Sequence, residues 1–160
     1  MTAPKATTCQ SLALVQWLAL CFAASATVFI ISPAGWYAGL QKPSWNPPGW
    51  IFGPVWTLLY LSMAVSAWLV WREGGWNKQR WALGLFLAQW LLNTLWTPLF
   101  FGMHLSGVAL AEIIGLWMVL VATLVAFWKV KISAAILLMP YVLWVCFAVA
   151  LNYTIWKMNS

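Results

Sequence analysis

The stretch LSGVALAEIIGLWMVLVATLVAFW, residues 105–128, decides the fold class. Its 24 residues include one ionisable side chain, that of Glu112. A hydrocarbon core about 30 Å thick is crossed by about 20 helical residues, so the stretch is long enough to span a bilayer once. Because lipid offers the backbone no hydrogen bonds, a crossing segment must satisfy its own, as an α-helix does. The stretch therefore predicts a transmembrane helix.

Similar apolar runs recur along the rest of the chain. The five predicted helices cover residues 11–32, 51–71, 81–101, 105–128 and 132–156. Each run is long enough to cross a membrane once and none is long enough to cross twice, whereas a β-barrel would show shorter, alternating segments. The sequence thus predicts an all-α integral membrane protein, a single domain over residues 1–160 built as a five-transmembrane-helix bundle.

The composition excludes several other classes of protein. Of 160 residues, 64% are hydrophobic, 6% are charged and 15 are tryptophan, whereas soluble domains carry about 25% charged residues. The single histidine and the three cysteines lack metal-ligand spacing, so no metal site is predicted. The basic residues lie between apolar runs, where they set membrane orientation, so the net charge of +6 does not indicate nucleic-acid binding.

Basic residues are divided unevenly between the two sides of the predicted bundle. The N-terminal side carries Lys5, Arg72, Lys78, Arg80, Lys129 and Lys131, and the other side carries Lys42 and Lys157. Cytoplasmic loops are enriched in Lys and Arg. The six basic residues on the N-terminal side, against two on the other side, therefore predict a cytoplasmic N-terminus in a bacterial envelope membrane.

The longest loop, residues 33–50, reads PAGWYAGLQKPSWNPPGW. Its four prolines exclude a continuous helix, and its four aromatic rings need to be covered. We interpret it as a lid folded back on the bundle. The alternative is an interfacial aromatic belt, but a belt does not require a loop so rich in proline.

Polar residues interrupt the apolar runs. Gln89, Asn93 and Thr97 follow one face of the third run at i, i+4 and i+8, and Asn152 and Glu112 lie in two other runs. Uncompensated polar groups are costly in hydrocarbon, so these side chains should face protein or a wet cavity. They either join helices by hydrogen bonds or line a ligand cavity, and the sequence leaves both interpretations open.

Small residues also recur at helical spacing. Gly107, Ala111 and Gly115 form one stripe, and Gly84 with Ala88 forms a second. Such stripes let helix backbones approach closely, so either one fits packing within the bundle or a homodimer face.

The loop and three later segments resemble a known family. Residues 36–48, WYAGLQKPSWNPP, resemble the first-loop signature of the translocator protein family (TspO/MBR), also called tryptophan-rich sensory proteins or peripheral benzodiazepine receptors. Further matches are GPVW at 53–56 with Tyr60, then Gln89, Leu92, Asn93, Trp96, Pro98 and FFG at 100–102, and finally Pro140, Tyr141, Trp144, Phe147, Ala148 and LNY at 151–153. The resemblance covers nearly the whole chain from about residue 33, and a bacterial member is favoured.

The resemblance implies a five-helix bundle, commonly homodimeric, with a cavity closed by the first loop. Family ligands are protoporphyrin IX, haem, cholesterol and synthetic benzodiazepine-site compounds. The residues that match the ligand site are Tyr37, Trp45, Trp56, Asn93, Trp96, Trp144, Ala148 and Leu151. In a eukaryote, the mitochondrial outer membrane would be the expected location.

Two further matches are less direct. The family's sterol motif is matched by Leu151, Tyr153 and Lys157. The alternative interpretation is that Tyr153 lies at the membrane interface and that Lys157 extends its ammonium to the membrane surface, with neither residue binding a sterol. Val108 stands where animal members place a cavity tryptophan, which is a departure from the animal drug site.

Several other tryptophans need no ligand to explain them. Trp17, Trp71, Trp81, Trp128 and Trp156 fall near span ends or on lipid faces, where interfacial anchoring is sufficient.

The resemblance leads us to expect a membrane receptor or carrier for tetrapyrroles, and for sterols, with a regulatory or stress-sensing role. It would need no cofactor, because porphyrin or haem is the ligand, and Lys42 could pair with porphyrin propionates. The alternative is a light-dependent enzyme that degrades protoporphyrin IX, with Tyr37, Trp56 and Trp144 as electron donors. A proton-coupled exporter ranks last, since Glu112 is alone and lies only ~9–10 Å below the membrane surface.

Overall fold

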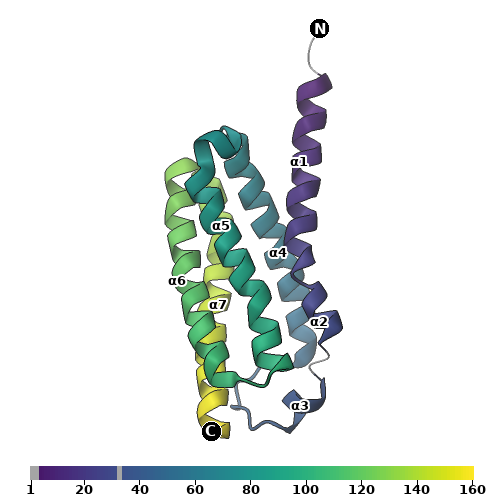
Figure 1. Cartoon of the computed structure of the whole chain (residues 1–160), viewed down its shortest axis with the longest axis vertical. Coiled ribbons are helices and arrows are strands. Elements are labelled where there is room, and N and C mark those ends of the chain that lie inside the picture. Colours follow the sequence, from purple (N-terminus) through teal and green to yellow (C-terminus); the bar gives the residue numbers. More distant parts are fainter. Residues whose placement is uncertain (1–3, 32–33) are drawn as a thin grey trace.

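Helices account for most of the chain in the computed structural model, which describes residues 4–31 and 34–160 (Figure 1). The elements are α1 (Pro4–Ala23), α2 (Ala26–Ile30), α3 (Ala34–Gly39), α4 (Gly49–Arg72), α5 (Gly75–Thr97), the π-helical turn η1 (Pro98–Gly102), α6 (Ser106–Val130) and α7 (Ile132–Asn159). No strand occurs in the described ranges, which agrees with the predicted all-α class.

Four helical segments are long and apolar enough to cross a membrane. They are α4, α5 together with η1, α6 and α7, and they correspond to the predicted runs 51–71, 81–101, 105–128 and 132–156. The prediction of an all-α membrane protein with these four spans is therefore confirmed.

The first predicted helix, residues 11–32, is not continuous, so that prediction was wrong in detail. α1 ends at Ala23, and a turn separates it from α2. Ser25 Oγ donates to the Phe22 carbonyl at 2.6 Å and Thr27 Oγ1 to the Ala24 carbonyl at 2.9 Å. Such local hydrogen bonds compete with the regular helical pattern. The apolar part of α1, Gln10–Ala23, is shorter than the four spans, so a fifth membrane crossing stays a prediction. Residue 32, the predicted end of this helix, lies outside the described residues.

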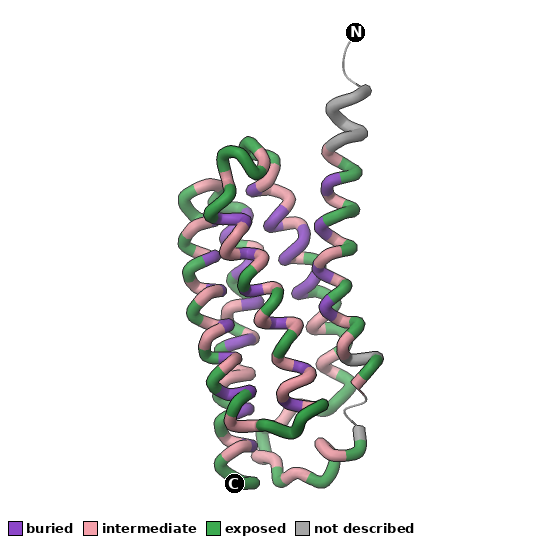
Figure 2. Tube along the Cα trace, viewed as in Figure 1, coloured by how far each residue is buried: buried purple, intermediate pink, exposed green. Residues whose placement is uncertain are grey.

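The helices form a bundle in which α4 contacts α1, α5 and α7, and α6 contacts α5 and α7 (Figure 1). Buried positions recur along most of the length of the bundle (Figure 2). In the core, Phe86 stacks on Phe127 with ring centroids 5.9 Å apart, and Trp17 meets Phe86 edge-on at 5.6 Å. Trp17 is only 7% exposed, so the expectation that it is an interfacial anchor was wrong.

The small-residue stripes lie in different surroundings. A Cβ added to Gly107 would come within 3.0 Å of Trp156 Nε1, so this glycine serves packing between α6 and α7. Gly84 and Gly115 have open space where a Cβ would be, and Ala88 is exposed. The open space at Gly84 and Gly115 and the exposed position of Ala88 leave room for a helix of a partner subunit, and the homodimer stays a prediction.

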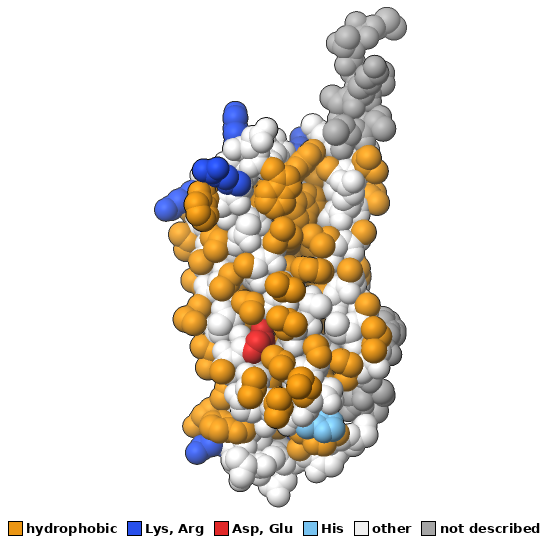
Figure 3. All heavy atoms as spheres, in the orientation of Figure 1, with side chains coloured by type: hydrophobic (Ala, Val, Ile, Leu, Met, Phe, Trp, Pro, Cys, Tyr) orange, Lys and Arg blue, Asp and Glu red, His pale blue; other side chains and the backbone are white. Residues whose placement is uncertain are grey.

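Charge is found at the two ends of the bundle. The N-terminus, the α4–α5 joint and the α6–α7 joint lie at one end, and the C-terminus and the first loop lie at the other (Figure 1). On the face shown in Figure 3, lysine and arginine side chains gather at the ends while the middle is largely apolar. This distribution suits an integral multi-pass membrane protein.

Candidate ligand site beneath the first loop

The first loop crosses the end of the bundle, at the bottom of Figure 1. It contains the short helix α3, followed by residues 40–48 without helix. Asn159, the last residue of α7, donates from Nδ2 to the Gln41 carbonyl and accepts at Oδ1 from the Gln41 N–H, both at 2.9 Å. These two bonds join residues 118 positions apart in the sequence, so the loop is tied down on the far end of α7.

Tyr37 organises the interior of the loop. Its hydroxyl donates to Asn46 Oδ1 at 2.8 Å. Lys42 Nζ lies 4.7 Å from the Tyr37 ring centre and donates to the carbonyls of Tyr37 and Leu40 at 2.6 and 2.9 Å. The sequence led us to expect that Lys42 pairs with a porphyrin propionate. Because the Lys42 ammonium already has carbonyl partners near the end of α3, it would have to give up these hydrogen bonds to do so.

Aromatic rings of the loop pack on the turn that follows α5. Tyr37 meets Phe101 edge-on at 5.5 Å, and Trp36 meets Phe100 edge-on at 5.6 Å. Trp36 also stacks on His104 with centroids 4.3 Å apart. The sequence around His104 carries no signal for a contact with a distant tryptophan, so this pair could not be predicted.

Trp45 and Trp144 meet at Phe147. Trp45 is 47% exposed and packs edge-on against Phe147 at 5.7 Å. Trp144 packs against Phe147 at 5.6 Å and edge-on against Phe52 at 5.9 Å. The loop is thus connected to α4 and α7 by a row of rings, as a lid over the bundle would require.

An apolar groove of about 440 Å³ runs between α4 and α7 beside these rings. It is lined by Val55, Leu58, Leu59, Pro140, Leu143, Trp144 and Phe147. Leu58 and Leu143 are 67% and 70% exposed, so the groove opens on the outer, lipid-facing surface. A hydrophobic molecule could reach it from the bilayer without an aqueous channel.

A second group of rings lies deeper, between α4, α5 and α7. Trp56 packs on Tyr60 at 5.3 Å and edge-on against Tyr141 at 6.2 Å. The Tyr60 hydroxyl donates to Asn93 Oδ1 at 3.3 Å. The Tyr141 hydroxyl also lies near Asn93 but makes no hydrogen bond of ordinary geometry within the described chain. Tyr60 and Tyr141 were not among the predicted site residues, although Tyr60 follows Trp56 by one helical turn.

The polar stripe on α5 faces the interior, as predicted. Gln89, Asn93 and Thr97 are 0%, 6% and 9% exposed. Among the described residues, neither the amide nitrogen nor the amide oxygen of Gln89 has a hydrogen-bond partner. Buried amides of this kind are rare, because the lost hydrogen bonds cost about 1–3 kcal/mol per group.

Asn152 and Trp96 join three elements. Trp96 Nε1 donates to Asn152 Oδ1 at 3.1 Å, and Asn152 Nδ2 donates to the Ser106 carbonyl at 3.0 Å. Trp96 stacks on Phe100 at 5.0 Å, in the cluster that also contains buried Leu151. Here the polar side chain links helices directly, which is the first of the two interpretations that the sequence left open.

The predicted site residues therefore divide into three neighbouring groups. Trp56 and Asn93 lie in the interior, Trp96 and Leu151 lie beneath the loop with Tyr37, and Trp45 and Trp144 lie beside the outer groove. Ala148 is half-buried against the main core. The structure thus brings these residues into the same half of the molecule, as three neighbouring groups.

The three residues of the sterol motif do not share a face of α7. Leu151 is 7% exposed, whereas Tyr153 is 49% exposed and Lys157 is exposed. This arrangement favours an interfacial tyrosine with a snorkelling lysine for the second and third positions.

We expect the loop to loosen at alkaline pH through Tyr37. Burial raises the pKa of its hydroxyl above 10.0, and the hydrogen bond to Asn46 lowers it by less. The raised pKa means that Tyr37 stabilises the folded loop fully below its unfolded pKa, and that this contribution is lost as pH rises through the folded pKa. The difference in phenolate absorbance between wild type and Tyr37→Phe should show a midpoint above pH 10; a midpoint at or below 10 would contradict the buried position.

Comparison with known proteins places these features in context. Residues 11–157 match the profile of the TspO/MBR family. The human translocator protein is 46% identical over 126 residues, which cover 78% of this chain and 75% of the human protein. The tryptophan-rich protein TspO of Chlorobaculum tepidum is 42% identical over 155 residues, 94% of this chain and 98% of that protein. The tryptophan-rich sensory protein of Cereibacter sphaeroides is 39% identical over 145 residues, 91% and 90% of the two chains.

Proposed function

Because the chain belongs to the TspO/MBR family, we propose that it is a membrane receptor or carrier for a flat, hydrophobic ligand. The ligand class is the tetrapyrroles, protoporphyrin IX and haem, with sterols as a second class. The names of its relatives, translocator protein and tryptophan-rich sensory protein, support transport and a regulatory role respectively.

The observation that carries the proposal is the set of rings between α4, α5 and α7, together with the buried amide of Gln89 on α5. The Trp56 ring centre lies 5.3 Å from that of Tyr60 and 6.2 Å from that of Tyr141. Among the described residues, the Gln89 amide has no hydrogen-bond partner, so it offers both a donor and an acceptor. Ligand sites typically combine apolar and aromatic walls with a few polar groups that set orientation. A macrocycle with a pyrrole core offers both a flat face for stacking and polar nitrogen atoms.

The groove between α4 and α7 supports entry from lipid. Its wall includes Trp144 and Phe147, which also contact the rings that lead to the first loop. In the proposed mechanism, the ligand partitions into the bilayer, enters along this groove and is covered by the loop. Release then requires the loop contacts at Tyr37 and Gln41 to open.

The test is a tryptophan-fluorescence titration of the purified protein in detergent, performed in the dark. Protoporphyrin IX and haem are expected to quench the emission saturably at micromolar concentration, because a bound porphyrin would lie close to several indoles. Cholesterol has no absorbing group, so it should act by displacing bound porphyrin. Absence of saturable quenching by either tetrapyrrole would contradict the proposal.

The contiguous rings of Trp56, Tyr60 and Tyr141 also favour a second candidate, light-driven degradation of bound protoporphyrin IX. A photoexcited porphyrin would take an electron from a nearby indole or phenol, so no metal or carboxylate pair is needed. The same titrated complex is then illuminated. Protein-dependent loss of porphyrin absorbance would favour the enzyme, and equal absorbance in light and dark would remove it.

A further inference from the structure

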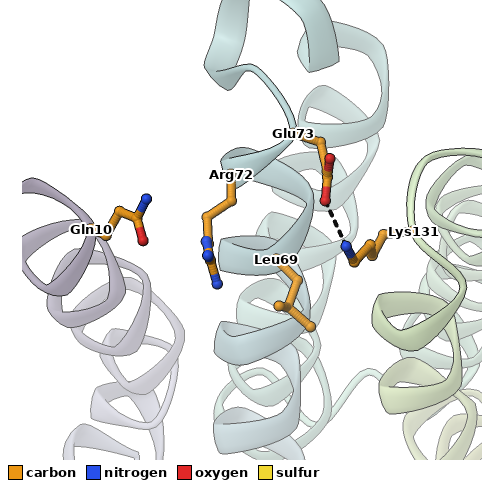
Figure 4. A pocket seen from close by; sticks show the side chains of 5 residues that line it. All are labelled: Gln10, Leu69, Arg72, Glu73 and Lys131. Carbon is orange, nitrogen blue, oxygen red and sulfur yellow. Dashed lines mark hydrogen bonds and ion pairs between the residues drawn. The ribbon is translucent and has the colours of Figure 1, made fainter. Parts of the chain in front are cut away.

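A polar pocket opens at the opposite end of the bundle from the first loop (Figure 4). Its volume is about 290 Å³. Gln10 of α1, Leu69 and Arg72 of α4, Glu73 immediately after α4, and Lys131 between α6 and α7 line it. In Figure 4, Arg72 extends between α1 and α4, while Glu73 and Lys131 meet on the other side. The ligand groups proposed above belong to the other half of the molecule, so this pocket is a separate feature.

The pocket is held in shape by contacts among its walls. Trp68 Nε1 donates to the Gln10 carbonyl at 2.9 Å, which fixes α1 against α4. The Arg72 guanidinium lies over the Trp68 ring, 4.6 Å from its centre. Ser66 Oγ donates to the Ala134 carbonyl at 2.7 Å, which fixes α4 against α7. Arg72 is therefore positioned before any ligand arrives, which reduces the entropy lost on binding.

The charges in the pocket do not balance. Lys131 Nζ lies 2.8 Å from Glu73 Oε1, whereas Arg72 forms no ion pair with a carboxylate of the described residues. One acidic and two basic side chains leave the pocket with a net positive charge. The Lys131 and Glu73 side chains are 44% and 40% exposed, and an ion pair so exposed contributes little stability. A stronger anion could share or take over Lys131.

The pocket lies at the level where lipid headgroups are expected. Arg72 is the last residue of the membrane-spanning segment Gly49–Arg72. Leu69, one turn deeper, gives the pocket an apolar wall on the membrane side. Lys131 precedes the first turn of α7, where unpaired N–H groups carry partial positive charge. The surroundings thus change from basic to apolar over one helical turn, as they do along a phospholipid.

From this geometry we propose that the pocket binds the phosphate group of an anionic phospholipid, with Arg72 and Lys131 as the donors. The planar guanidinium suits the two non-bridging phosphate oxygens at once, and the ammonium can share one of them. Glu73 competes with the phosphate for Lys131 and so limits the affinity. The lipid's chains then lie against the apolar surface below Leu69.

Native mass spectrometry of the detergent-purified full chain tests this proposal. The protein is titrated with dioleoyl phosphatidylglycerol, with dioleoyl phosphatidylcholine, and with glycerol 3-phosphate as a soluble phosphate ester without lipid chains. We expect phosphatidylglycerol to bind more tightly than phosphatidylcholine, and Arg72→Gln or Lys131→Gln to weaken it about tenfold. Glu73→Gln should strengthen binding, a gain that a folding defect cannot produce.

Matched variants separate a built site from general surface charge. Arg80→Gln and Lys129→Gln remove the same charges at the same end of the bundle but do not line the pocket. The proposal predicts that they leave phosphatidylglycerol binding nearly unchanged. Equal losses in the Arg72 and Arg80 variants, or no preference for the anionic lipid, would overturn it. Binding of glycerol 3-phosphate as tight as that of the lipid would overturn the assignment to a headgroup.

Discussion

Replacing Phe86 by Ala is expected to lower the free energy of unfolding by roughly 2–4 kcal/mol. Phe86 is completely buried and connects three helices, through Trp17 of α1 and Phe127 of α6. Losing apolar transfer energy matters less in lipid than in water, because the surrounding chains are apolar too. The cavity and the lost van der Waals contacts remain, so the cost is large.

The measurement is reversible unfolding in mixed micelles of mild detergent and dodecyl sulfate, followed by circular dichroism. Leu91→Ala provides the matched control on the same helix, because Leu91 is 52% exposed. Surface substitutions usually change stability by less than about 0.5 kcal/mol. If both variants lost the same stability, Phe86 would not have the central packing role that its contacts indicate.

Replacing Trp56 by Ala is expected to weaken protoporphyrin IX binding by about thirty- to a hundredfold. A tryptophan that packs against a ligand buries a large area and adds about 0.5–1.5 kcal/mol from stacking, and 1.4 kcal/mol corresponds to a tenfold change. Trp56→Phe keeps an aromatic face and should lose only a few-fold. Affinity is measured by porphyrin absorbance in the dark, so that loss of an indole emitter does not affect the signal.

Trp81→Ala is the control for this prediction. Trp81 is 78% exposed and lies in α5 close to the α4–α5 joint, at the end of the bundle away from the first loop. It should bind porphyrin like the wild type. Equal losses in the Trp56 and Trp81 variants would indicate adsorption to general apolar surface and would refute the interior site.

The four long spans could be predicted because a membrane makes simple demands. A segment such as residues 105–128 needs only enough apolar residues to cross, and length and composition report this directly. The inward orientation of Gln89, Asn93 and Thr97 was predictable for a similar reason. Amides are costly in lipid, and a spacing of four residues places them on one helix face.

The candidate site was predictable only in part. Trp56, Asn93 and Trp96 were found through resemblance and spacing, and the structure buries or half-buries them beside partners. Their contacts were not predicted. The hydrogen bond between Tyr60 and Asn93 and the stacking of Trp36 on His104 each join two different elements, and local sequence does not show which elements become neighbours. The pocket at Arg72 was missed as well, since it combines α1, α4 and the α6–α7 joint.

The sequence by itself determined that this protein is helical, that its solvent is lipid, and that the polar stripe of Gln89, Asn93 and Thr97 faces inward. Only the tertiary structure decided that Trp17 belongs to the core, that Lys42 serves the first loop, and that Arg72 and Lys131 share a pocket. The physical reason is that solvent matching acts on each segment separately, so it can be read along the chain. Contacts between helices depend on which elements become neighbours, and that is settled by packing across the whole bundle.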